Sequence, residues 1–168
     1  MDRPLNPLPL DAPGHPVMKQ QDGGQSPPAG VKRILIVDDH PVIRRGLTAL
    51  LSTAPEFAVC GEADTAATAL DAMRRLSPDV VLADVAMPGT NGIELIKLML
   101  AERPKLLILT VSMHDESLYA MRALRAGAKG YVTKSETQNH LIEALRKIMN
   151  GGLYVSPQYS ERLINNIV

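Results

Sequence analysis

The sequence lacks tryptophan, has one phenylalanine and one cysteine, and carries no formal net charge at neutral pH. Because Cys60 is the only cysteine, no disulfide can form within the chain, which is typical of a reducing compartment such as the cytoplasm. We interpret Cys60 as a small apolar residue in a strand. The zero net charge gives the chain as a whole no basic surface for nucleic acid.

Long apolar runs are also absent. No stretch approaches the ~20 apolar residues of a membrane-spanning helix, and the N-terminus has no continuous apolar segment typical of a secretory signal. We therefore expect a soluble cytoplasmic protein that has no membrane partner.

The first thirty residues differ in composition from the rest. Residues 1–30 contain seven of the thirteen prolines and four glycines, with only scattered apolar residues. Such a segment cannot bury enough surface to offset the entropy lost on ordering, so we predict a disordered leader.

Apolar runs and amphipathic segments alternate from residue 31 onward. The short, mostly aliphatic runs are typical of strands buried on both faces. They are residues 34–37, 57–60, 80–83, 106–109 and 130–133. Apolar residues at spacings of three and four predict helices between them. These helices fall within residues 42–51, 66–76, 93–100, 118–124 and 141–149.

This alternation predicts an α/β fold with a single domain over residues 31–150. Five strands that alternate with five helices form a parallel sheet covered on both faces. We expect a flavodoxin-like (βα)5 doubly wound parallel sheet with strand order 2-1-3-4-5. Residues 151–168 are interpreted as a linker.

Polar residues follow the predicted strands at the edge where doubly wound sheets bind ligands. They are Asp38 and Asp39 after the first strand, Asp84 after the third, Thr110 after the fourth and Lys134 after the fifth. A single aspartate in this place is most often a helix cap, but clustered carboxylates repel one another and imply a counter-charge. Mg²⁺ fits because it binds carboxylate and phosphate oxygens, and an aspartate can act as a nucleophile toward phosphorus.

The motifs ILIVDDHP, VVLADVAMPGTNG, LLILTVS and GAKGYVTKS stand in the order found in response regulators. Over residues 31–150 the chain resembles their receiver domains. The resemblance implies that Asp84 accepts a phosphoryl group from a sensor histidine kinase. It also implies that Asp38, Asp39, Asp84 and the backbone carbonyl of Ala86 bind Mg²⁺.

The same resemblance assigns roles to the later strands. Thr110 and Lys134 would contact the phosphoryl oxygens, and Thr110 would move inward on phosphorylation. Tyr131 resembles the aromatic residue that changes rotamer in receiver signalling, although a half-buried structural tyrosine is an equal alternative. Activity would be limited to self-phosphorylation and autodephosphorylation, so the chain is not expected to be an enzyme in the ordinary sense.

A narrower resemblance concerns DDHPVIRRGL and the ending GGLYVSPQYSERL, which look like the NarL/FixJ family of transcriptional regulators. That family implies a homodimer on phosphorylation and DNA binding through a helix-turn-helix domain that follows the linker. No such domain precedes the end at Val168. We expect either part of a longer regulator or a free-standing one, and we favour the former.

Three other functions are alternatives to this one. A pseudo-receiver that is never phosphorylated ranks first among them. A haloacid-dehalogenase-type phosphatase would need an aspartate two residues after Asp38, where the chain has His40. A nucleotide- or flavin-binding module would need a glycine-rich or hydroxyl-rich phosphate loop after the first strand.

Zinc chemistry is not expected. The four histidines, His15, His40, His114 and His140, are spaced so widely that they form no ligand set. His40 and His114 either line the rim of the site or are solvated loop residues, and we favour the latter.

Overall fold

The computed structural model describes residues 28–87 and 89–167. Residues 1–27 of the predicted disordered leader, and His15 with them, lie outside the described residues. In the part of the chain that is described, no helix combines the length and the apolar character needed to cross a membrane.

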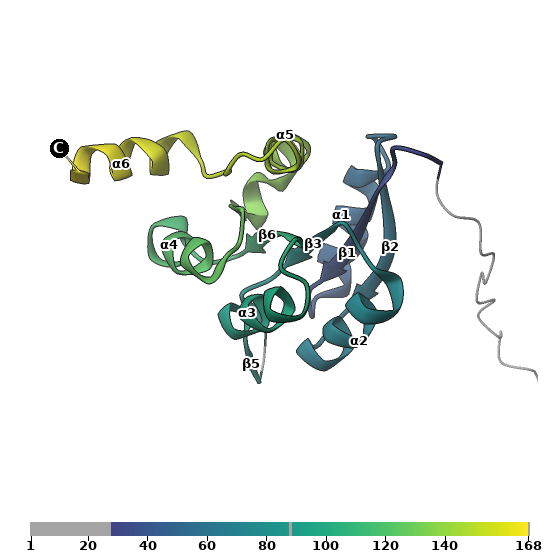
Figure 1. Ribbon diagram of the computed structural model, residues 1–168. Coiled ribbons are helices and arrows are strands. Elements are labelled where there is room, and N and C mark those ends of the chain that lie inside the picture. The colour runs from purple at the N-terminus through teal and green to yellow at the C-terminus, as the bar shows by residue number, and fades with distance from the viewer. Residues whose placement is uncertain (1–27, 88, 168) are drawn as a thin grey trace, which may run out of the picture.

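A parallel sheet of five strands forms the centre of the fold (Figure 1). Its strands are β1 (Lys32–Val37), β2 (Phe57–Ala63), β3 (Val80–Ala83), β6 (Leu107–Ser112) and β7 (Gly130–Thr133). They lie in the order β2-β1-β3-β6-β7, and each pairs in parallel with its neighbours. This confirms the predicted flavodoxin-like order 2-1-3-4-5, because β4 (Ala86–Met87) and β5 (Thr90–Asn91) form a separate small antiparallel pair.

Helices cover both faces of this sheet. They are α1 (Pro41–Leu51), α2 (Ala66–Leu76), α3 (Gly92–Glu102), α4 (Glu116–Ala126) and α5 (Thr137–Met149). Buried residues of α1 and α5 pack with Ile34 and Ile36, whereas those of α2, α3 and α4 pack with Leu35 and Val37. Successive side chains of a strand point to opposite faces, so the buried part of β1, residues 34–37, contributes to both cores and is apolar throughout.

The fourth strand of the sheet extends further than its apolar run. β6 continues through Thr110 to Ser112, and all residues from Ile108 to Ser112 are buried. The predicted site residue Thr110 therefore lies within the strand rather than at its end.

The segment after α5, which we interpret from the sequence as a linker, contains a helix. Tyr154 forms a parallel bridge with Gly130 at the outer edge of β7, and α6 (Pro157–Ile167) follows. The backbone amide of Ser156 donates to Glu116 Oε1 of α4 at 2.7 Å, and Tyr159 is buried in the core on the α4 side of the sheet. In Figure 1, α6 lies above α4 and extends away from the sheet.

Candidate functional site

Asp38 and Asp39 lie directly after β1, at the carboxyl edge of the sheet. Asp38 is 1% exposed, and its Oδ1 accepts a hydrogen bond from the backbone amide of His40 at 2.8 Å. Asp39 is only partly buried, with 23% of its side chain exposed. The first carboxylate thus forms the floor of the site and the second its rim.

Asp84 directly follows β3, which is the neighbour of β1 in the sheet. It is 2% exposed, and its Oδ1 accepts a hydrogen bond from the amide of Ala86 at 2.9 Å. This bond turns the chain into the small β4–β5 pair, which leads to α3. The carboxylate is therefore held by its own loop.

Gly92 allows α3 to begin against the backbone that carries Asp84. A Cβ atom at residue 92 would lie 2.3 Å from Val85 Cα and 2.8 Å from the carbonyl oxygen of Asp84. Real Cβ atoms essentially never approach backbone so closely. The glycine therefore sets the distance between α3 and the loop that carries the acidic residue.

Lys134, directly after β7, brings the counter-charge to both buried carboxylates. Its Nζ lies 2.7 Å from Asp38 Oδ2 and donates to Asp84 Oδ2 at 2.8 Å. The lysine side chain is 3% exposed and both carboxylates are 2% exposed. Burial lowers the pKa of Lys134, but hydrogen bonds to Asp38 and Asp84 outweigh it and raise this pKa above its usual value. The lysine is therefore held in its charged form.

Thr110 is fully buried in β6, one strand away from Asp84. It pairs with Ala83, the residue before Asp84, and on its other side with Tyr131. Among the described residues no hydrogen-bond partner reaches the Thr110 hydroxyl. A buried polar atom without a partner is rare in folded proteins and often marks a functional position.

Tyr131 is completely buried, with its ring in the core on the α4 side of the sheet. Its hydroxyl donates to the backbone carbonyl of His114, in the loop after β6, at 3.0 Å. Burial raises the pKa of Tyr131 to about 12. The ring therefore connects the sheet beside Thr110 with the loop that leads into α4, and its change of rotamer stays a prediction.

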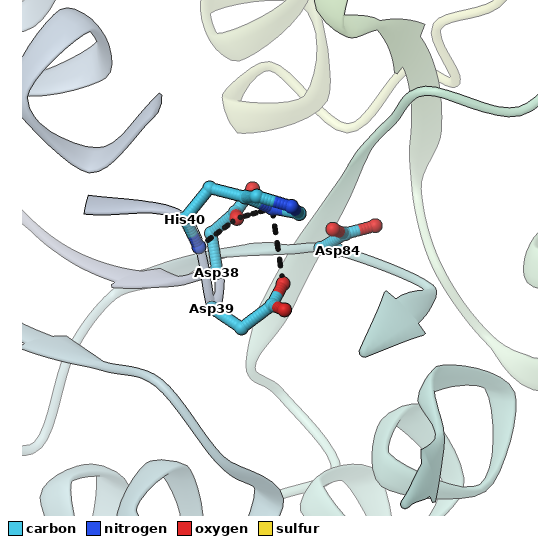
Figure 2. A group of neighbouring side chains, drawn as sticks. All are labelled: Asp38, Asp39, His40 and Asp84. Carbon is cyan, nitrogen blue, oxygen red and sulfur yellow. Dashed lines mark hydrogen bonds and ion pairs between the residues drawn. The ribbon is translucent and has the colours of Figure 1, made fainter. Parts of the chain in front are cut away.

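His40 belongs to the site, although its spacing from the other histidines does not indicate this. Its Nδ1 lies 3.0 Å from Asp38 Oδ1 and 3.1 Å from Asp39 Oδ1 (Figure 2). Asp38, Asp39, His40 and Asp84 each place one possible ligand atom within 4.8 Å of the others. The sequence could have placed His40 in the site by its position directly after Asp38 and Asp39, at the end of a buried strand, but not by the spacing of the histidines.

The charges of this cluster fit a divalent cation. Three carboxylates, from Asp38, Asp39 and Asp84, lie near the single ammonium of Lys134. Hard oxygen ligands of this kind are those that Mg²⁺ prefers. The predicted contribution of the Ala86 carbonyl stays a prediction; the residue lies in β4 and is partly buried.

Comparison with known protein families gives one match, which covers most of the described chain. Residues 34–146 match the model of the response regulator receiver domain. The chain is 38% identical over 131 residues to the response regulator GacA of Pseudomonas viridiflava, an alignment that covers 78% of this chain and 61% of GacA. The chain thus spans about three fifths of the length of this relative.

Solved structures agree with this match. A two-component response regulator of the LuxR family from Aurantimonas sp. SI85-9A1 is 36% identical, with a TM-score of 0.76, and the comparison covers 81% of this chain and 97% of that one. Another similar structure contains two RcsB dimers bound to two parallel DNAs. It is 25% identical, with a TM-score of 0.72, and the comparison covers 78% of this chain and 67% of that one.

Proposed function

This chain belongs to the response regulator receiver family, and from that premise we propose that it accepts a phosphoryl group on Asp84 from a sensor histidine kinase in the cytoplasm. It is homologous to regulators of the NarL/FixJ family. The observation that carries the proposal is the surroundings of Asp84, which is buried beside Asp38 and paired with Lys134. The receiver unit would comprise residues 31–150, with residues 151–168 as the connecting segment.

The acidic group of Asp38, Asp39 and Asp84 is typical of a receiver Mg²⁺ site. We assign the ligands to these carboxylates and to the backbone carbonyl of Ala86. When bound, Mg²⁺ supplies positive charge that neutralises phosphoryl oxygens. Asp39 lies on the partly exposed rim, so the ion would enter the pocket past this side chain.

The transfer needs positioning and charge compensation more than acid–base chemistry. A carboxylate oxygen of Asp84 attacks the phosphorus of the kinase phosphohistidine, and the P–N bond breaks with its electron pair going to the imidazole nitrogen. The Ala86 amide keeps Asp84 oriented through Oδ1. Lys134, already bound to Asp84 Oδ2, pairs with the charge that the phosphoryl group brings.

The response of the fold is assigned to Thr110 and Tyr131. The hydroxyl of Thr110, which has no partner among the described residues, donates to a phosphoryl oxygen when one is present. Its inward movement leaves space that the neighbouring ring of Tyr131 takes up. This requires loss of the hydrogen bond to the His114 carbonyl, which frees the loop before α4. The phosphoryl group would thereby shift a two-state element of the fold.

The output is proposed to be dimerisation and control of transcription. RcsB, a relative of known structure, binds DNA as dimers. In this protein DNA would be bound by a domain outside the residues printed here, and dimerisation would align two such domains on symmetric half-sites.

Intact-protein mass spectrometry tests the assignment of Asp84. The wild type, incubated with Mg²⁺ and a small acyl-phosphate donor, is expected to gain the mass of one phosphoryl group, and Asp84→Asn to gain none. Asp71→Asn is the matched control, because Asp71 is an exposed carboxylate on α2. It should be phosphorylated like the wild type.

Two outcomes would contradict the proposal. If the wild type gains no mass while a receiver of known activity does, the chain is a pseudo-receiver that acts only by binding partners. If Asp84→Asn still gains the phosphoryl mass, another residue is the acceptor. Sedimentation velocity on the same samples tests the dimer, which should form in the phosphorylated wild type and not in Asp84→Asn.

A further inference from the structure

We propose that His40 is a further ligand of the cation in the acidic pocket. Its imidazole would make the pocket bind nitrogen-preferring divalent ions such as Co²⁺, Ni²⁺ and Zn²⁺ more tightly than Mg²⁺. This inference rests on the cation site of the proposed function and extends it to the identity of the metal.

The first support is the position of the imidazole. His40 Nδ1 lies 3.0 Å from Asp38 Oδ1 and 3.1 Å from Asp39 Oδ1, so one nitrogen faces two carboxylate oxygens at once. Figure 2 shows the ring over these two side chains, on the side where Asp84 also lies. One nitrogen and three carboxylates thus meet on one side of the sheet edge.

Their spacing is close to that of a coordination sphere. The four donor atoms lie within 4.8 Å of one another. Two ligands bound ~2.1 Å from one ion are at most about 4.2 Å apart, so the cluster needs to contract by roughly 0.6 Å at its widest. Changes in the exposed side chains of His40 and Asp39 can provide this contraction, since Asp38 and Asp84 are buried.

Lys134 does not contact the oxygen of Asp38 that faces the His40 ring. The ammonium contacts Asp38 Oδ2, whereas His40 contacts Oδ1. One oxygen of the Asp38 carboxylate therefore contacts Lys134, and the other contacts His40. An ion bound beside His40 does not have to displace Lys134 from Asp38.

The local backbone explains why the imidazole faces the pocket. His40 precedes Pro41, and a residue before proline favours extended backbone, as observed at φ −95° and ψ 110°. Its amide is fixed to Asp38 Oδ1 at 2.8 Å, which folds residues 38–40 into a tight turn. His40 occupies the N-cap position of α1 without making a side-chain cap bond, so the ring does not serve the helix.

The chemistry of the donor set then predicts selectivity. Mg²⁺ binds oxygen ligands and retains several waters, whereas imidazole favours Zn²⁺, Ni²⁺, Cu²⁺ and Fe²⁺. Compared with three carboxylates alone, one added nitrogen donor increases the preference for the latter group. His40 thus determines which divalent ions compete with Mg²⁺ for the site.

Calorimetric titration of tag-free protein with Co²⁺ and separately with Mg²⁺ tests this inference. We expect the wild type to bind Co²⁺ more tightly than Mg²⁺. His40→Ala should weaken Co²⁺ binding by about tenfold or more, the scale for loss of a supporting group at a metal site. The same substitution should leave Mg²⁺ binding within about threefold, because Mg²⁺ gains little from nitrogen. The Co²⁺ absorption spectrum should change with the loss of the nitrogen ligand.

His140→Ala is the matched control, since His140 is also partly exposed and paired with a carboxylate, that of Glu143 on α5. It should bind both ions like the wild type. Equal Co²⁺ affinity in the wild type and His40→Ala would overturn the inference, as would a wild type that prefers Mg²⁺.

The phosphorylation assay with Mg²⁺ separates this inference from the proposed function. A wild type that takes up the phosphoryl group but shows no His40-dependent Co²⁺ binding refutes the histidine ligand alone. A wild type that binds Co²⁺ through His40 but never gains the phosphoryl mass supports the ligand and refutes the function.

Discussion

At the scale of single residues, Lys134 compensates the charge of two buried carboxylates. Its ammonium is shared between Asp38 and Asp84, and all three side chains are at most 3% exposed. Buried ion pairs contribute little net stability over apolar residues, but removal of one partner leaves the other charge unpaired in a medium of low polarity. The lysine is thus needed for stability, in addition to the role in phosphoryl binding that we propose for it.

Replacement of Lys134 by alanine should therefore lower the free energy of unfolding by about 3 kcal/mol, at the lower end for a broken buried pair. Urea denaturation measures this difference. Lys97→Ala is the control and should have almost no effect, because the Lys97–Glu94 pair is exposed. Addition of Mg²⁺ should recover part of the loss, since a cation that binds only the folded state stabilises it. Unchanged stability of Lys134→Ala would mean that the two carboxylates do not depend on the ammonium.

Tyr131 makes stability depend on pH in the alkaline range. Burial raises its pKa to about 12 in the folded protein, above the ordinary value of 10.0 for a tyrosine. A group that holds its proton more tightly when folded contributes full stability below the unfolded pKa and loses that contribution as pH rises through the folded pKa. The affected window thus lies between about pH 10 and pH 12.

We expect the urea midpoint of the wild type to fall more steeply in this window than that of Tyr131→Phe. The raised pKa values of Lys134 and Tyr154 act in the same direction in both proteins, so the difference between the two slopes isolates Tyr131. Equal slopes would show that the hydroxyl of Tyr131 ionises as readily in the folded as in the unfolded chain.

At the scale of elements, α3 is packed against the loop that carries Asp84. Gly92→Ala should destabilise the protein, because its Cβ would lie 2.3 Å from Val85 Cα and push α3 or the loop away. It should also slow phosphorylation, because Asp84 moves with that backbone. Urea denaturation and the rate of mass gain measure the two effects.

Gly46→Ala is the matched control with the opposite expected sign. Gly46 lies inside α1, with nothing within 4 Å of an added Cβ. An alanine there should stabilise the protein by roughly 0.5–1 kcal/mol, the usual advantage over glycine in a helix. If Gly92→Ala and Gly46→Ala have the same free energy of unfolding, the close contact at residue 92 does not affect stability.

α6 depends on its contact with α4. Glu116 in the first turn of α4 accepts hydrogen bonds from the backbone amide and the side chain of Ser156, just before α6 begins. An isolated helix of eleven residues is marginal in water, so its stability must come from such contacts and from buried Tyr159.

Glu116→Ala, which removes both acceptor oxygens, should accordingly increase hydrogen exchange of the α6 amides while leaving those of β1 and β3 protected. Glu161→Ala, an exposed change on α6 itself, should have no such effect. Exchange mass spectrometry resolves these segments. Unchanged protection of α6 would mean that Tyr159 and Leu163 hold the helix without Glu116.

The elements that the sequence pattern predicts are those with many apolar residues of their own. Buried parallel strands such as β3 are continuous apolar runs, and in amphipathic helices such as α5 the apolar residues recur at spacings of three and four. α6 has apolar residues at helical spacing, but Tyr159 is its one buried residue, so the helix depends on tertiary contacts, and from the sequence we interpret the segment as a linker. β4 and β5 have two residues each, too few for any periodicity.

At the scale of the whole molecule, topology explains why the site could be predicted. Asp38, Asp84 and Lys134 are far apart in the chain but follow strands of one parallel sheet, whose carboxyl ends meet at one edge. Their convergence thus follows from strand order alone. The direction of the His40 ring depends instead on the turn at residues 38–40. The burial of the Thr110 hydroxyl, which has no partner in the part of the chain that the structure describes, depends on the extension of β6 past its apolar run. Neither feature has a signal in the apolar pattern.

The bridge between Tyr154 and Gly130 affects whether the protein associates with other copies of itself. Strand β7 is an outer strand of the sheet, and the Tyr131 amide and Lys129 carbonyl on its free side are bonded to Tyr154 at 2.9 Å each. A chain shortened to end at Asn150 should expose these groups, and light scattering should detect its slow association into larger particles. An unshielded outer strand is a template on which other chains assemble and aggregate. The segment after α5 thus protects the protein from self-association through β7, independently of any role in signalling.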